Sequence, residues 1–195
     1  GFMKRLLTIL VALLVFSGTV FAQEEGDIYD DGYIYEQNGA GDQYFKADLF
    51  ANFPVSFGNK LFVGGGFTIG YYRFLNSLIA VGGEVSPTYN VSIGVKSLIM
   101  VPITLGAVIV PTINKFEFPI GLSLGITSST FDNTTSYFPS FTAKAYLGGF
   151  YRINESWSVG LSGYFLWTPQ IFADAPEKNY HGLFATAGLS MRYHF

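Results

Sequence analysis

The last residues of the chain alternate between two kinds of side chain with a period of two. From Leu183 to Phe195 every odd-numbered residue is apolar, whereas the even-numbered positions hold Phe184 and then small or polar residues. Successive side chains of a β-strand point to opposite faces, so this pattern predicts a strand with one apolar face. Beyond residue 42 no helical period persists, and the same alternation recurs. Residues 43–195 are therefore expected to form an all-β fold.

Eight segments show this alternation, and turn residues separate them. They are 44–53, 61–73, 79–89, 101–113, 118–127, 141–153, 157–168 and 183–195. The fourth segment is nearly all apolar and is the one segment whose pattern would also be compatible with a helix. Pro102, Pro111 and the β-branched residues between them favour a strand.

The connections between these segments alternate in length. Residues 75–76, 114–115 and 154–156 are short turns, whereas 56–60, 91–97, 130–140 and 170–182 are generally longer and more polar. Short connections at one end and longer ones at the other are typical of an up-and-down outer-membrane barrel. We therefore expect an eight-stranded antiparallel transmembrane β-barrel, with both chain ends on the short-turn, periplasmic side.

Alternation alone does not say which face looks outward, because a soluble barrel such as a lipocalin would show the same period. Only 13% of the residues are charged, about half the usual share. The less apolar face is mostly glycine, serine, threonine and tyrosine, which suits a narrow interior better than a surface in water. Two same-face aromatic pairs, Trp157 with Trp167 and Phe141 with Tyr151, are each ten residues apart. That spacing covers roughly 25 Å after tilt, the height of the apolar band between two aromatic girdles.

The N-terminus has the three parts of a secretory signal peptide. Lys4 and Arg5 precede an apolar run of 11 residues, 6–16, and small residues lead to a cut before Gln23. A membrane-spanning helix needs about 20 apolar residues, so this run is too short for an anchor. We expect a signal peptide over residues 1–22, with two extra residues ahead of Met3, and a transmembrane barrel over residues 43–195.

Residues 23–42 lie between these parts and carry seven acidic residues and no basic residue. The acidic spacing does not match an EF-hand loop, and acidic runs are usually solvated. This segment is expected to be a flexible periplasmic lead-in, with a weak docking role left open.

The chain resembles the small eight-stranded outer-membrane proteins of diderm bacteria: the OmpA transmembrane domain, OmpX, OmpW and the opacity-type proteins. The final Leu189, Met191, Tyr193 and Phe195 resemble the C-terminal signal read by the barrel assembly machinery. The resemblance covers residues 43–195. It implies the outer membrane as location, and membrane lipid, the assembly machinery and periplasmic chaperones as partners.

Little in the sequence supports catalysis or metal binding. There is no cysteine, and the two histidines, His181 and His194, show no spacing typical of a catalytic or zinc site. No enzymatic activity, catalytic residue, metal or cofactor is expected. The net charge of −3 gives no footprint for nucleic acid.

Charged residues on the inner face are more informative, because a charge inside a narrow barrel must be paired or hydrated. We expect a lumen charge cluster that plugs the lower lumen, with a gating role as the alternative. Its members are Lys46, Asp48, Glu84, Glu117, Lys144, Arg152 and Arg192.

Large apolar residues are also expected on the inner face, in the upper lumen, and resemble the OmpW pattern of a narrow channel for small hydrophobic compounds. They are Phe50, Phe62, Val108, Val110, Phe150, Leu166 and Phe184. Two functions stay open. One is a structural or surface-interaction role in which the outer loops bind a host or surface ligand, and the other is a narrow channel.

Overall fold

The alternating segments form β-strands in the computed structural model of the chain, which describes residues 37–56, 61–92, 94, 96–131, 135–170 and 180–195. The chain divides into two compact units, Gly1–Gln37 and Asn38–Phe195. The expected signal peptide and most of the acidic segment lie outside the described residues.

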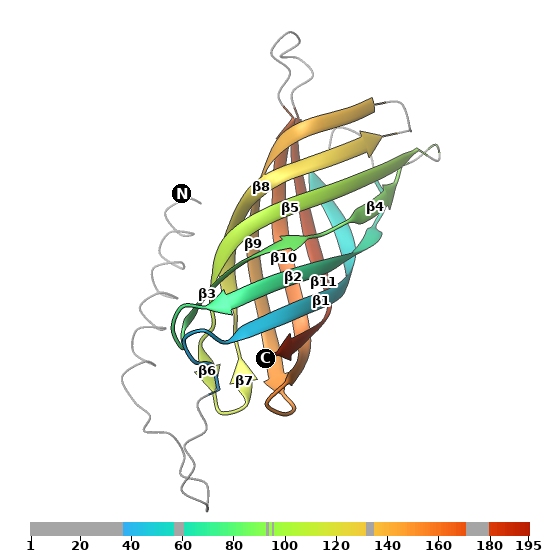
Figure 1. Cartoon of the computed structure of the whole chain (residues 1–195). Coiled ribbons are helices and arrows are strands. Elements are labelled where there is room, and N and C mark those ends of the chain that lie inside the picture. The colour runs from blue at the N-terminus through green and yellow to red at the C-terminus, as the bar shows by residue number, and fades with distance from the viewer. Residues whose placement is uncertain (1–36, 57–60, 93, 95, 132–134, 171–179) are drawn as a thin grey trace, which may run out of the picture. The chain divides into compact units, whose positions relative to one another are not determined.

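Eleven strand segments make up the described part of the second unit (Figure 1). They are β1 (Gln43–Ser56), β2 (Gly64–Phe74), β3 (Ile79–Val85), β4 (Thr88–Val91), β5 (Ser97–Ile109), β6 (Thr112–Ile113), β7 (Phe116–Glu117), β8 (Ile120–Phe131), β9 (Thr135–Arg152), β10 (Trp157–Gln170) and β11 (Tyr180–His194). All pairings are antiparallel. β11 pairs with both β10 and β1, and β10 also pairs with β9, so the sheet closes on itself.

The closed sheet has eight strands, which confirms the expected fold. β3 and β4 count as one strand because both keep a single register against β2, with Ile69 opposite Val85 and Gly66 opposite Thr88. The ladder is interrupted at Ser86 and Pro87, since proline has no backbone N–H to donate. β6 and β7 form a small hairpin at the short-turn end, ahead of β8.

One expected outer loop is wrong. Residues 130–140 were expected to form a connection, but β8 continues to Phe131 and β9 already begins at Thr135, with Thr130 paired to Ser136. The other long connections, 57–60 and 171–179 together with residues 93 and 95, lie outside the described residues.

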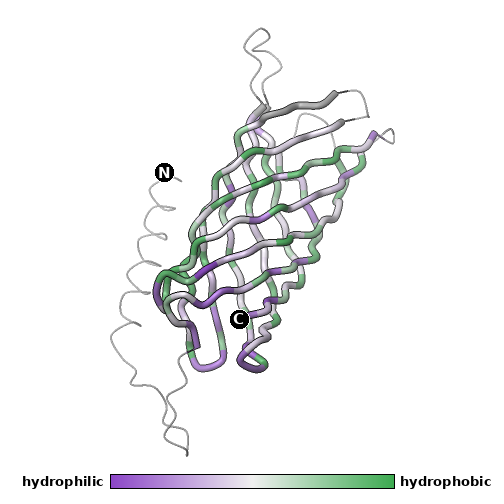
Figure 2. The backbone as a smooth tube through the Cα atoms, in the orientation of Figure 1, coloured by the Kyte–Doolittle hydropathy of each residue, from purple (hydrophilic) through white to green (hydrophobic). Residues whose placement is uncertain are grey.

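Hydropathy alternates along the strands (Figure 2), and the burial of the side chains shows that the two faces of the wall differ as the alternation predicts. Along β10 and β11 the inward positions are mostly buried and polar, whereas the outward positions carry exposed apolar side chains such as Leu161 and Leu189, which are 65% and 67% exposed. The prediction for Phe62 is wrong: its side chain is 57% exposed, because β2 begins only at Gly64 and its alternation does not reach Phe62. Within the described residues, no helix is long and apolar enough to cross a membrane.

Candidate functional site

Four charged side chains meet in the middle of the lumen. The Lys46 ammonium on β1 lies 3.0 Å from both the Asp48 and the Glu84 carboxylates. The Glu84 carboxylate, on β3, also forms an ion pair with the Lys144 ammonium of β9, at 2.7 Å. All four side chains are at most 2% exposed, so Glu84 connects two buried lysines that project from different walls of the barrel.

Three more charges meet at the short-turn end. The Glu117 carboxylate, on β7, accepts from Arg192 of β11 at 3.1 Å and pairs with Arg152 of β9 at 3.3 Å. Arg192 also donates to the Tyr146 hydroxyl at 3.3 Å and is fully buried. All seven residues of the expected lumen charge cluster therefore lie inside the barrel, in an upper group of four and a lower group of three.

Aromatic rings close the space around these cations. The Lys46 ammonium lies 3.9 Å from the Tyr146 ring centroid, and the Lys144 ammonium lies 3.8 Å from that of Tyr164. The Arg192 guanidinium stacks on Phe150, with 3.7 Å from Cζ to the ring centroid. A cation over a ring face is attracted by the ring quadrupole, which offsets part of the lost hydration.

Hydroxyl groups extend the upper charged group to further strands. Ser190 of β11 donates to Asp48, and Lys144 donates to the Ser86 hydroxyl at 2.9 Å. The Thr68 hydroxyl of β2 donates to Ser86 at 2.8 Å. The resulting network runs from β11 through β1 and β3 to β9 and β2. Breaking one of these contacts would leave a buried charge without its partner, so the network ties these strands together inside the barrel.

Apart from Phe62, the expected apolar lumen residues are buried, but they do not all lie in one part of the lumen. Phe50, Leu166 and Phe184 lie toward the long-connection end, where Leu166 pairs with Phe184. Val108 is paired with Ala80, near the start of β3, and Phe150 with Glu117, so these two lie at the short-turn end, as does Val110. The expected apolar residues are therefore divided between the two ends of the lumen.

Sequence reasoning missed an amide pair that lies above the charged groups. The Asn52 side chain donates to the Asn90 amide oxygen at 2.6 Å. Asn90 in turn donates to the carbonyls of Phe62, at 2.9 Å, and of Asn52, at 3.2 Å. Both asparagines are buried, and the pair ties β4 to β1 across the start of β2.

Replacing Asn90 with alanine is expected to lower the free energy of unfolding by about 1–3 kcal/mol, because the buried Asn52 side-chain amide and the Phe62 carbonyl lose their partner. Urea unfolding of the refolded protein, followed by tryptophan fluorescence, measures this loss. Ser128→Ala, at a half-buried position of β8, serves as the control and should stay within about 0.5 kcal/mol of the parent. Equal stability of the two variants would contradict a structural role for the amide pair.

His194 lies inside the short-turn mouth, and its Nε2 is 2.9 Å from the Ser158 hydroxyl. The serine and histidine are both buried, and no carboxylate among the described contacts orients the ring. His181 lies on the outer face and stacks on Trp167. Within the described part of the chain, no group of three or more histidine, cysteine, aspartate or glutamate side chains could hold a metal ion.

Comparisons with known proteins agree with this architecture. A protein-family model matches residues 23–193 of the chain. Neisserial surface protein A matches with a TM-score of 0.67 and 12% identity, covering 80% of this chain and 99% of its own. The outer membrane protein OprG from Pseudomonas aeruginosa matches with a TM-score of 0.54 and 12% identity, over 82% of this chain and 98% of its own.

A third structure, the attachment invasion locus protein Ail of Yersinia pestis, has a TM-score of 0.51 and 14% identity, over 80% of this chain and 99% of its own. The chain has the fold of the small eight-stranded outer-membrane β-barrel proteins. A search of curated protein sequences returned no match.

The outer face of the barrel carries aromatic rings near both ends. Phe141 and Trp167 face each other with ring centroids 6.2 Å apart at the long-connection end. At the short-turn end, Trp157 lies 4.9 Å from Tyr193, and Tyr151 lies 5.3 Å from Phe116. The four expected girdle residues therefore all lie on the outer face, in two groups.

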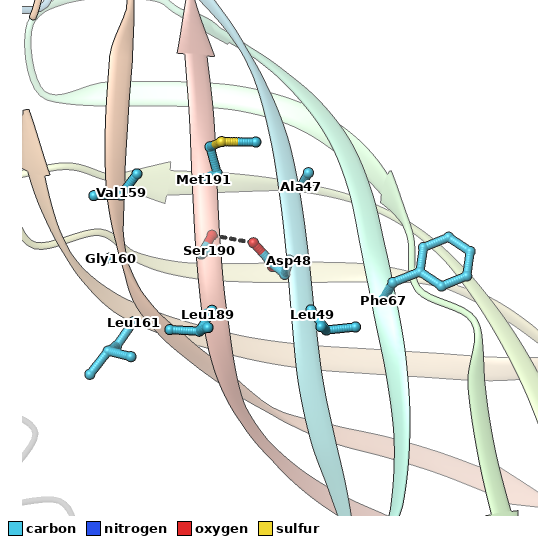
Figure 3. Close-up of a pocket in the computed structure, with 10 residues that line it drawn as sticks. All are labelled: Ala47, Asp48, Leu49, Phe67, Val159, Gly160, Leu161, Leu189, Ser190 and Met191. Atoms are coloured by element: carbon cyan, nitrogen blue, oxygen red, sulfur yellow. Dashed lines mark hydrogen bonds between the residues drawn. The ribbon is translucent and has the colours of Figure 1, made fainter. Parts of the chain in front are cut away.

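The residues of the expected assembly signal also lie on this outer face of the barrel protein. Leu189, Met191, Tyr193 and Phe195 are all exposed. A shallow groove of ≈ 670 Å³ runs beside them, between large side chains that include Leu49, Leu161 and Leu189 (Figure 3). The polar side chains at its floor, Asp48 and Ser190, are hydrogen-bonded to each other.

Proposed function

We propose that this protein is a non-enzymatic outer-membrane barrel with a closed lumen, which acts at the cell surface through its long-connection end. The observation that carries the proposal is the bridge formed by Glu84 between Lys46 and Lys144. It joins β3 to β1 and β9 inside the barrel. A lumen crossed by such pairs serves to hold the wall together.

The energetics of charge burial support a closed lumen over a channel. Moving an ion past Glu84 requires the two lysines to separate from it, and each unpaired buried charge costs several kcal/mol. Eight strands leave an interior that side chains alone can fill. The aromatic rings of Tyr146 and Tyr164 occupy the remaining space beside the lysines.

The long-connection end supports a role in surface interaction. β8 and β9 stay paired beyond the aromatic girdle, up to Phe131 opposite Thr135. The pairing of β9 with β10 ends at Ala143 opposite Trp167. Among the described residues, the part of β9 ahead of Ala143 therefore has a neighbour on one side only. A free strand edge is a surface on which an extended segment of a partner protein can add a strand.

The location and the biogenesis partners are part of the same proposal. We place the protein in the outer membrane of a diderm bacterium, with lipid against the apolar face. Leu189, Met191, Tyr193 and Phe195 form the C-terminal signal that the barrel assembly machinery reads, and periplasmic chaperones carry the unfolded chain to it. The residues ahead of Gln43 would face the periplasm.

A planar-bilayer recording of the refolded protein tests the closed lumen. The parent should show no reproducible conductance steps, whereas the double variant Glu84→Ala with Lys144→Ala should show them, because two crossing side chains are removed together. Leu122→Ala, on the outer face, is the matched control and should stay silent. Reproducible conductance of the parent would favour a narrow channel over the closed lumen.

Cysteine labelling in intact cells tests the orientation, since the chain has no cysteine of its own. Lys96→Cys, at the long-connection end, should react with a membrane-impermeant maleimide. Glu155→Cys, in the turn between β9 and β10, should react only after the outer membrane is permeabilised. The reverse result would place the short turns at the cell surface and refute the proposed orientation.

A further inference from the structure

The three short turns share a feature that their role as connections does not require. In each turn, an exposed aliphatic residue is followed directly by asparagine: Leu75 by Asn76, Ile113 by Asn114 and Ile153 by Asn154. The three aliphatic side chains are 58%, 51% and 52% exposed. A turn in water is normally polar, so three large apolar side chains at the same end of the barrel need a partner.

The asparagines hold these turns in fixed conformations. The Asn76 side-chain oxygen accepts from the N–H groups of Leu78 and Ile79, at 2.9 and 2.8 Å. Asn154 repeats this geometry with Ser156 and Trp157, at 3.0 and 2.8 Å. Asn114 takes a φ of 52°, in the left-handed region that asparagine tolerates.

The turns occupy positions all around the barrel. They connect β2 to β3, β5 to β8 (through β6 and β7) and β9 to β10. Each turn joins a different pair of neighbouring strands of the closed sheet, so the three turns are spread around the barrel. A protein partner would fit one contiguous patch, whereas a medium that surrounds the barrel can contact all three turns at once.

The apolar turn residues lie next to the aromatic girdle at the short-turn end of the outer face, which is called the aromatic collar below. Ile113 pairs with Phe116, whose ring lies 5.3 Å from Tyr151, and Ile153 lies two residues beyond Tyr151. On the other side of the barrel, Tyr71 lies four residues ahead of Leu75, and its ring lies 5.5 Å from that of Phe45. The apolar band consequently does not end at the collar and extends into the turns.

Two exposed cations accompany the aliphatic residues. Arg73 lies two residues ahead of Leu75, and Lys115 lies two residues after Ile113. Long cationic side chains at the end of a membrane span can place their charge among lipid phosphates while their stems stay in the apolar layer.

We propose that the short turns are seated in the phospholipid head-group layer, with Leu75, Ile113 and Ile153 reaching the acyl boundary. Arg73 and Lys115 bind lipid phosphates beside them. The inference rests on the proposed membrane location, and it moves the boundary of the membrane from the aromatic collar to the turns. The mouth of the lumen, with His194 and Ser158, then lies at head-group level.

Single-cysteine variants test this seating. Leu75→Cys, Ile113→Cys and Ile153→Cys are each labelled with a polarity-sensitive dye and refolded into vesicles of phosphatidylethanolamine and phosphatidylglycerol. Ser77→Cys and Glu155→Cys, at exposed polar positions of the same turns, are the matched controls. The three aliphatic positions should show blue-shifted emission, quenching by head-group nitroxide lipids and weak quenching by aqueous iodide. The controls should show strong iodide quenching.

Iodide quenching at the aliphatic positions equal to that of the controls would overturn the inference. So would shielding in native cell envelopes that is absent from pure lipid vesicles, since that result identifies a protein partner. Leu122→Cys, in the middle of the apolar band, separates this failure from failure of the membrane location. If its dye is shielded by lipid while the turns are exposed, only the seating of the turns is wrong, and if its dye is also exposed, the membrane location itself fails.

Discussion

Replacing Glu84 with alanine is expected to lower the free energy of unfolding by about 3–5 kcal/mol, the cost of leaving buried charges without their partner. Glu84 is the shared partner of Lys46 and Lys144, and the Lys144 side chain is fully buried. Lys46 keeps Asp48 at 3.0 Å, so most of the loss falls on Lys144. Urea unfolding in lipid vesicles, together with the gel mobility of the unheated protein, measures the effect.

A second variant separates the charge effect from the loss of packing. Glu84→Leu combined with Lys144→Met removes one charge of each sign and fills the space with apolar groups. Replacing both members of a buried ion pair in this way is often neutral, so the double variant should recover most of the stability lost by Glu84→Ala. A loss below about 1 kcal/mol for Glu84→Ala would mean that water hydrates these charges and that no tight bridge exists.

Leu122→Arg is expected to destabilise the membrane-inserted protein by about 2–4 kcal/mol, the cost of a cation at the middle of the apolar band of a barrel. The Leu122 side chain is 71% exposed and lies opposite Ala145 of β9, about midway between the girdle residues Phe141 and Tyr151. In a soluble protein the same change at so exposed a position would be close to neutral. Unfolding in lipid vesicles therefore measures which medium surrounds this face.

Val55→Arg is the matched control for this substitution. Val55 is also exposed but lies near the long-connection end of β1, where the cost of a cation falls to about 0–1 kcal/mol. Similar stabilities for the two arginine variants would argue against a lipid-facing band and for a barrel in water.

The fold could be predicted from the sequence because alternation and closure reinforce each other. A slip of one residue would turn the whole apolar face of a strand inward, so the pattern along each strand fixes its register. Leu161, Leu189 and Leu49 lie side by side on three neighbouring strands. Their parity in the sequence already assigns all three to the outer face.

The partners inside the lumen could not be predicted in the same way. The sequence places Glu84 and Lys144 on the inner face, but whether they meet depends on how far the strands tilt and stagger around the barrel. Alternation carries no information on that stagger. The Asn52–Asn90 pair was missed for the same reason, since a single asparagine on an inner face has no distinctive spacing.

Two errors have clear physical causes. Residues 130–140 look like a loop because a strand that rises above the membrane no longer needs an apolar face, so its alternation disappears. Val108 was expected in the upper lumen, although β5 runs from the long-connection end to the short-turn end and thereby places Val108 low. The strand direction was already implied by the expected wiring.

The closure between β1 and β11 has a consequence for how the protein folds. Its contacts join the two ends of the barrel sequence, as in the Ser190–Asp48 hydrogen bond across 142 residues. Contacts of such long sequence separation form late and slowly, because the intervening chain must lose its freedom before they bring any gain. Until β11 arrives, Glu117 lacks Arg192 and β1 remains an open edge that invites aggregation. Closure of the barrel therefore depends on the last strand to be synthesised. A chain that ended before residue 183 could not close, and its open edges would favour aggregation.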